Sequence, residues 1–146
     1  MSKLTFLVAL LLSLFLISCG RGDDSIPGRP TVPPGVVAVE VVYLNHPPVR
    51  PVLAEVDNLL TAYGEQVNVA RYDFDTPEGE AFAKARKLTE HTPLAIFING
   101  SMEFRVNGRA VKFYSFPQGQ GTGIVPDGAW TVEDLRQVLD QVTKGS

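Results

Sequence analysis

The apolar run Val36–Tyr43 constrains the fold more than any other segment of the chain. It is nearly continuous and rich in β-branched residues, which is typical of a strand buried on both faces. Pro47 and Pro48 follow, and residues 48–63 then repeat apolar side chains at three- and four-residue spacing, as an amphipathic helix does. A strand, a proline corner and a helix in this order predict an α/β fold.

The rest of the chain continues the alternation of strand and helix patterns. Apolar runs predict strands, three- and four-residue spacing predicts helices, and a stretch rich in glycine and proline predicts a loop. We expect further strands at 67–73, 94–98, 102–106 and 110–116, helices at 78–89 and 131–142, and a loop at 118–128.

Turn and cap residues indicate how these elements connect. Asn99-Gly100 and Asn107-Gly108 each lie between β-prone segments, which predicts two hairpins and therefore antiparallel pairing. The strand–helix–strand order of the first half predicts a parallel pair with a right-handed crossover. Thr131 and Asp134 have the spacing of a capping box at the start of the last helix. The predicted fold class is α/β, with a central mixed sheet flanked by helices.

The N-terminus carries an export signature. Lys3 precedes the apolar run Leu4–Ile17, which is shorter than the about 20 apolar residues that cross a bilayer. The run ends in Leu16-Ile17-Ser18-Cys19, which resembles a bacterial lipobox and holds the chain's one cysteine. This resemblance implies a lipoprotein signal peptide at 1–18 and a lipid, such as palmitate, on Cys19. The alternative is a free cysteine after an ordinary signal peptide.

The lipobox resemblance also implies a location. A lipidated Cys19 anchors the protein to a membrane, and Gly20 after it favours the periplasmic face of the outer membrane in a two-membrane cell. In a one-membrane cell the protein would face outward from the plasma membrane. Residues 19–35 form a flexible linker rich in glycine and proline, and residues 36–146 form the folded domain.

The element order resembles the thioredoxin fold, and particular residues support the resemblance. Val69–Asp75 is similar to the family's second strand and its closing aspartate, and Thr92–Gly100 is similar to the segment that carries the family's cis-proline. Counting back without gaps, His46-Pro47-Pro48-Val49 falls on the Cys-x-Pro-Cys motif, and Glu40 falls on the buried acid beneath it. The resemblance covers roughly residues 36–100 and the last helix.

The two motif positions hold His46 and Val49 in place of cysteine. Thiol–disulfide exchange needs an attacking thiolate and a second sulfur, and imidazole replaces neither. We therefore expect no oxidoreductase activity and no cofactor.

Three further positions have alternative interpretations. His46 is either a ligand-facing donor or acceptor, or an exposed side chain at a degenerate site. Glu40 is either a buried acid, or a glutamate that lies at a strand edge or is paired with a base such as Lys112. The resemblance implies a cis peptide before Pro93 and, with Thr92, a groove for an extended partner peptide.

Other site types find little support. Only two histidines, His46 and His91, are present, so we expect no metal site. The net charge of −3 and the absence of a basic cluster argue against nucleic acid. Gly119–Gly123 is glycine-rich like a phosphate loop but lacks the GK[ST] ending, so a surface loop is the favoured interpretation.

These inferences lead to one functional hypothesis and two alternatives. The hypothesis is a membrane-anchored, redox-inactive, thioredoxin-like module of the bacterial cell envelope that binds an envelope protein or an extended peptide. Its expected contact surface is His46, Pro47, Pro48 and Val49 together with Thr92 and Pro93. The alternatives are a non-redox enzyme that uses His46 with a nearby carboxylate, and a purely structural lipoprotein.

Overall fold

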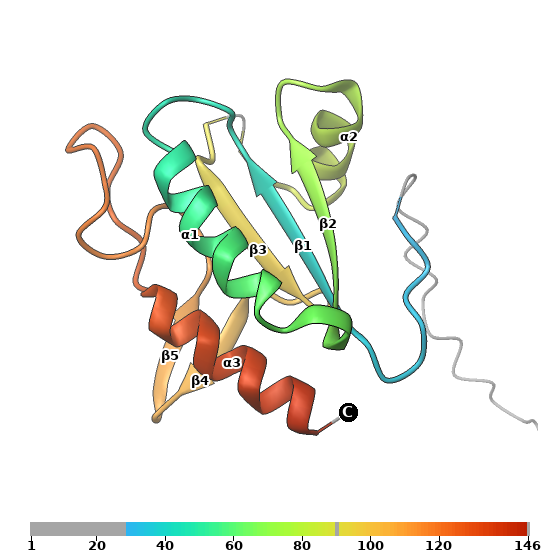
Figure 1. Cartoon of the computed structure of the whole chain (residues 1–146). Coiled ribbons are helices and arrows are strands. Elements are labelled where there is room, and N and C mark those ends of the chain that lie inside the picture. The colour runs from blue at the N-terminus through green and yellow to red at the C-terminus, as the bar shows by residue number, and fades with distance from the viewer. Residues whose placement is uncertain (1–28, 90, 146) are drawn as a thin grey trace, which may run out of the picture.

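The computed structural model describes residues 29–89 and 91–145, and its elements follow the predicted order. Cys19 and the predicted signal peptide lie outside the described residues. The elements in chain order are β1 (Val37–Tyr43), α1 (Arg50–Thr61), a short 3-10 helix (Gly64–Gln66), β2 (Val67–Asp73), α2 (Pro77–Ala85), β3 (Leu94–Ile98), β4 (Glu103–Val106), β5 (Arg109–Lys112) and α3 (Val132–Lys144) (Figure 1).

Strand β1 is the centre of a three-stranded mixed sheet with the order β2-β1-β3. It runs parallel to β2 and antiparallel to β3, with Val39 opposite Val69 on one side and Ile98 on the other. The prediction of a parallel first half is therefore confirmed. Of the two predicted hairpins, the one at Asn107-Gly108 forms as β4–β5, whereas β4 does not pair with β3 across Asn99-Gly100 and lies in a separate two-stranded sheet. The protein is a mixed α/β fold.

Helices cover both faces of this sheet. Val37, Val39 and Val41 of β1 pack into the larger core, which α1 and α3 complete. Val42 points to the opposite face, where it packs with Tyr72 and with Phe82 of α2. The alternation of side chains along a strand thus gives β1 buried apolar side chains on both faces, as its nearly continuous apolar run predicts.

The predicted strand 110–116 divides into two parts. Its first part is β5, which pairs with β4 across the Asn107-Gly108 turn. Its second part lies along β3, where the Ile96 N–H donates to Phe113 O and the Ser115 N–H donates to Leu94 O. The chain therefore extends the β3 edge after it has formed the hairpin.

All three helices differ by one or more residues from their predicted bounds, and two of these differences have clear local reasons. α1 begins at Arg50 because residues 46–49 form a turn in which the Val49 N–H donates to His46 O. α2 ends at Ala85 because Lys87 adopts a left-handed conformation with φ of 56°, which a helix cannot continue through.

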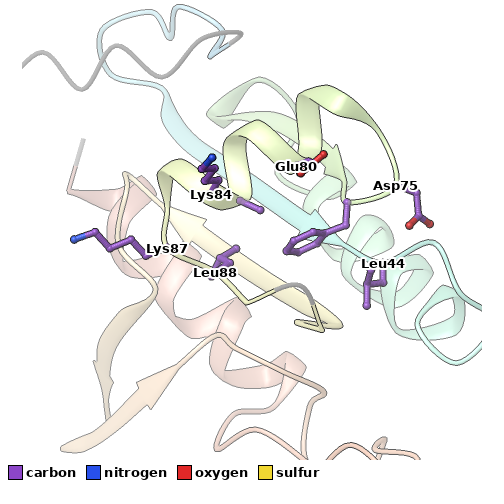
Figure 2. A pocket seen from close by; sticks show the side chains of 8 residues that line it. Leu44, Asp75, Glu80, Lys84, Lys87 and Leu88 are labelled. Carbon is purple, nitrogen blue, oxygen red and sulfur yellow. The ribbon is translucent and has the colours of Figure 1, made fainter.

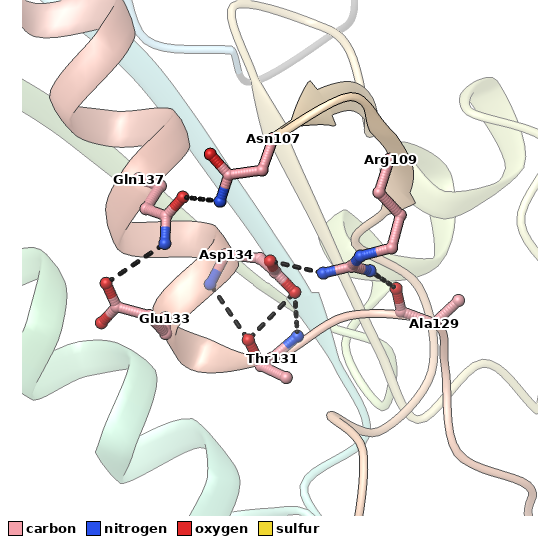
Figure 3. Close-up of polar contacts among 7 residues, drawn as sticks. All are labelled: Asn107, Arg109, Ala129, Thr131, Glu133, Asp134 and Gln137. Atoms are coloured by element: carbon pink, nitrogen blue, oxygen red, sulfur yellow. Dashed lines mark hydrogen bonds and ion pairs between the residues drawn. The ribbon is translucent and has the colours of Figure 1, made fainter.

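Helix α3 is fixed to the β4–β5 hairpin by polar contacts (Figure 3). The predicted capping box is confirmed, since Thr131 Oγ1 accepts from the Asp134 N–H and Asp134 Oδ2 accepts from the Thr131 N–H. Arg109 of β5 donates to Asp134 Oδ1 at 2.6 Å and to Ala129 O at 3.0 Å. Asp134 therefore both caps the helix and holds the hairpin against it.

Candidate functional site

A hollow of about 280 Å³ lies at the end of the sheet where β1 leads into α1. We call it the His46 groove. Three separate segments meet in it: the corner after β1, the residues before β3, and the loop after β5. It is lined by Leu44, His46, Pro48, Val49, His91, Pro93, Phe116, Thr122 and Val125.

The corner His46–Val49 presents two kinds of side chain. His46, Pro47 and Pro48 are exposed, whereas Val49 is buried and belongs to the larger core. Asn45 holds the corner in place, because it accepts from Arg50 Nε at 3.1 Å and donates to Asp73 Oδ2 at 3.2 Å. Of the two positions that resemble the cysteines of the thioredoxin motif, only His46 faces solvent.

His46 has a carboxylate neighbour, but the two groups are outside hydrogen-bond distance. His46 Nε2 lies 3.8 Å from Asp75 Oδ2, and their side chains are 58% and 59% exposed. A general base needs a partner within about 2.6–3.2 Å and is usually held by a further group. Glu40, the other carboxylate considered for this role, is paired elsewhere.

Glu40 is buried in the middle of the central strand, as its position in an apolar run predicts. Its Oε2 accepts from Arg86 Nη2 at 2.9 Å, and Arg29 Nε lies 2.6 Å from its Oε1. The proposed pairing with Lys112 is wrong, because Lys112 pairs with Glu103 across the hairpin. The sequence did not reveal either arginine as a partner, since both lie far from Glu40 along the chain.

The expected cis peptide before Pro93 is also wrong. The structure contains no cis peptide bond among the residues it describes. Thr92 is fully buried, its N–H donates to Thr89 O at 3.0 Å, and its hydroxyl lies 3.1 Å from that of Tyr114. Pro93 O then accepts from the Leu44 N–H. These bonds hold the ordinary trans path, which the intrinsic preference of an X–Pro bond also favours by about 0.5–1 kcal/mol.

The burial of Thr92 changes the surface that is open to a partner. Its N–H is already used within the chain, so the described structure does not offer it to an added peptide strand. Hydrogen bonds with Thr89 and Thr92 also lower the pKa of the Tyr114 hydroxyl below its ordinary value. Of the Thr92-Pro93 pair, only Pro93 lines the groove.

The glycine-rich loop after β5 is organised around one carboxylate. Asp127 accepts from the Gly119 N–H at 2.8 Å and from the Gly121 N–H at 2.6 Å. A phosphate loop would turn such amides toward its ligand, whereas these two are occupied from within the loop. Gln120 also donates to Glu55 of α1, which ties the loop to the helix.

This loop contributes a wall of the groove that the sequence did not indicate. Phe116, Thr122 and Val125 line the hollow together with the corner residues. Ile124, at the tip, is 92% exposed and is the large apolar side chain most open to solvent among the described residues. No sequence motif predicts these contacts, because they depend on the loop conformation that the hydrogen bonds of Asp127 stabilise.

A second and larger hollow, of about 580 Å³, lies between the end of β1 and α2 (Figure 2). Leu44 lines it too and therefore separates the two hollows. Lys84 and Lys87 lie at one end and Asp75 at the other, and Phe74 and Leu88 are among the apolar residues that line it. Its rim thus carries charges of both signs, unlike that of the His46 groove.

Searches of the described residues for other site types gave two negative findings. No group of three or more histidine, cysteine, aspartate or glutamate side chains in that part of the chain could hold a metal ion. No helix within residues 29–89 and 91–145 is long and apolar enough to cross a membrane.

Comparisons of the whole chain with protein-family models, with curated proteins and with solved structures found no match.

Proposed function

We propose that this protein is a redox-inactive, thioredoxin-like binding module that holds an apolar side chain of a partner polypeptide in the His46 groove. The partner is an extended segment of a cell-envelope protein. The module is attached to the membrane through a lipid on Cys19, as the lipobox resemblance implies.

The composition and size of the groove carry this proposal. Apart from His46 and His91, its lining is apolar or hydroxyl-bearing and holds no charged side chain. Its volume of about 280 Å³ is at the lower limit of small-molecule sites, which span roughly 300–1,000 Å³. A hollow of this size suits one large side chain of a polypeptide better than a cofactor.

The exposed side chain at the rim supports a protein partner. Ile124 projects from a loop whose fold is fixed by Asp127, so it is presented to solvent on an ordered support. Exposed apolar groups beside a pocket are a common feature of protein-binding surfaces. We infer that Ile124 adds contact area next to the side chain held in the groove.

The arrangement of the first strands supports the resemblance to thioredoxins, but the cis peptide that the resemblance implies before Pro93 is absent. The order of the elements, from which the resemblance was drawn, is the observed one, and β1 is parallel to β2 as the strand–helix–strand order predicts. The peptide before Pro93 is trans, so the proposal rests on the groove and not on a peptide bound to Thr92.

Site-specific crosslinking in cells tests this function. A photoreactive amino acid at Thr122 should give a discrete crosslinked product in the otherwise unchanged chain. The substitution His46→Trp fills the groove from an exposed position and should abolish that product. Glu65→Trp adds the same side chain at an exposed site on the 3-10 helix, outside the groove, and should leave it unchanged. A product that survives His46→Trp would refute the groove as the binding site.

A further inference from the structure

The segment before β1 contacts the buried carboxylate of the central strand. Arg29 Nε lies 2.6 Å from Glu40 Oε1 as an ion pair, and Arg86 Nη2 donates to Glu40 Oε2 at 2.9 Å. The Glu40 side chain is only 3% exposed. Removing a carboxylate from water costs several kcal/mol unless it is well paired, so both cations contribute to holding this charge inside the fold.

The two arginines come from different kinds of structure. Arg86 follows α2, and its guanidinium lies 4.8 Å from the ring centre of Phe97 and 5.4 Å from that of Phe82. It is therefore a fixed part of the domain. Arg29 belongs to no helix or strand, yet its side chain is only 30% exposed. The part of the chain expected to be a free linker thus supplies half of the pairing of Glu40.

A chain reversal brings Arg29 to this position. The Val36 N–H donates to Pro33 O at 3.2 Å, and Gly35 has a φ of +81°, which favours glycine. The chain before the turn therefore runs back past the start of β1 (Figure 1). Without such a reversal, Arg29 would lie far beyond the end of the strand from Glu40.

The contact lies beside the middle of β1, outside the His46 groove, and the Arg29 guanidinium extends toward the turn after β3. A Cβ on Gly100, in the turn after β3, would be 4.0 Å from Arg29 Nη2. Gly100 follows Ile98, which is opposite Val39 near the beginning of β1. The groove lies past the other end of β1, where the Leu44 N–H meets Pro93 O.

We propose that Arg29–Val36 is a strap that docks on the domain through the ion pair of Arg29 with the buried Glu40. The strap fixes the point where the N-terminal part of the chain joins the domain, beside the middle of β1. Glu40 is accordingly an anchor for the strap. This inference goes beyond the proposed function and does not depend on a partner.

The burial of Glu40 distinguishes this contact from an ordinary surface ion pair. Exposed pairs typically contribute little to stability, because water and salt screen the charges and two long side chains lose entropy. Here the acceptor is almost fully buried and held by Arg86, so the strap meets a preformed site. The substitution Arg29→Ala removes the cation that pairs with Glu40. It should therefore release the strap and leave the sheet and helices folded.

Backbone ¹⁵N relaxation on the full chain tests the strap. We expect order parameters near 0.85 for the Thr31 and Val32 amides in the unchanged protein, and below about 0.6 in Arg29→Ala. Arg105→Ala removes an exposed arginine of β4 that pairs only within its own hairpin, and it should leave both values unchanged. Low order parameters in the unchanged protein, or high ones in Arg29→Ala, would overturn the proposal.

A second variant tests the other side of the contact. Glu40→Gln keeps the shape of the side chain and removes its charge, so it should lower the order parameters of Thr31 and Val32 as Arg29→Ala does. The amides of β1 report whether the sheet remains intact in this variant. An intact sheet with a still rigid strap would show that charge pairing does not hold the segment.

Discussion

At the scale of single residues, several side chains have roles that depend on one or two measured contacts. Lys87 ends α2 in a left-handed conformation, with its N–H donating to Lys84 O and the next N–H, of Leu88, donating to Ala83 O. Glycine usually occupies such a position because other residues pay about 1–2 kcal/mol to adopt it. The fold therefore contains local strain at an exposed lysine.

Replacing Lys87 should relieve that strain. We expect Lys87→Gly to raise the free energy of unfolding by about 0.5–1 kcal/mol, after allowance for the greater freedom of glycine in the unfolded chain. Lys84→Gly makes the same chemical change inside the helix and should lower it by about 1 kcal/mol. Urea unfolding measures the free energy of unfolding of both variants. A lower value for Lys87→Gly than for the unchanged protein would contradict the strain at Lys87.

Asp134 links stability to pH. Burial opposes its charge, but hydrogen bonds from Arg109 and Thr131 outweigh burial and hold its pKa below 3.8 in the folded protein. The unfolded chain has an ordinary aspartate pKa of about 3.9. Because the folded pKa is the lower one, the stabilisation is present above about pH 4 and is lost as the pH falls through the folded pKa.

The substitution Asp134→Asn should show this dependence. It should cost about 1.5–3 kcal/mol at pH 6, where it removes charge-assisted hydrogen bonds. The cost should shrink as the pH falls toward 2, because the wild-type carboxylate then becomes protonated as well. Unfolding free energies of both proteins at pH 6 and at pH 2.5 measure the cost of the substitution at each pH. An equal cost at pH 6 and pH 2.5 would count against the charged pairing of Asp134 with Arg109.

At the scale of elements, the strands were predictable and the loops were not. β2 and β3 occur at the predicted residues, because β2 has an alternating pattern and β3 is a short apolar run between Pro93 and the Asn99-Gly100 turn. The Asn99-Gly100 and Asn107-Gly108 turns also follow from sequence, since all four residues adopt positive φ. The loop 117–129 could not be predicted, because its shape depends on Asp127 meeting amides several residues away.

The same dependence of loops on distant contacts explains which parts of the candidate site could be predicted from the sequence. The sequence placed His46, Pro48, Val49 and Pro93 near one another, and all four line the groove. It could not place the loop residues Thr122 and Val125 in the lining of the groove. Nor could it show that Thr92 is buried next to Tyr114. Both depend on the path of residues 113–116 along β3, where the hairpin strand changes partners.

The loop supplies a prediction at this scale. Asp127→Asn keeps one acceptor oxygen and loses the charge, so the amides of Gly119 and Gly121 should exchange with solvent markedly faster. The amides of β1 should exchange at the wild-type rate, since the loop is remote from the centre of the sheet. Hydrogen exchange followed by NMR measures both sets, and unchanged exchange at Gly119 and Gly121 would mean that Asp127 does not organise the loop.

At the scale of the whole molecule, the strap docks beside the middle of β1, whereas the groove lies past the end of that strand. If the chain is held to a membrane through Cys19, we expect the docked strap to keep the start of β1 nearer to the lipid surface than the groove. A partner would then be met on the side of the domain that faces away from the anchor.

Paramagnetic broadening from lipids tests this orientation. On vesicles that contain spin-labelled headgroups, the lipidated full chain should show stronger amide broadening at Asn99–Ser101 than at His46 and Ile124. Arg29→Ala should reduce the contrast, because the strap no longer fixes the domain. Stronger broadening at His46 and Ile124 in the unchanged protein would place the groove toward the membrane and contradict the arrangement.

The central claim is that the His46 groove binds an apolar side chain of an extended polypeptide. The most direct test is selection of random displayed peptides on the domain, with the His46→Trp variant as the counter-target. We predict enrichment of peptides that share one large apolar residue, and loss of their binding to His46→Trp but not to Glu65→Trp. Failure to enrich any sequence, or enriched peptides that bind His46→Trp equally well, would contradict the claim.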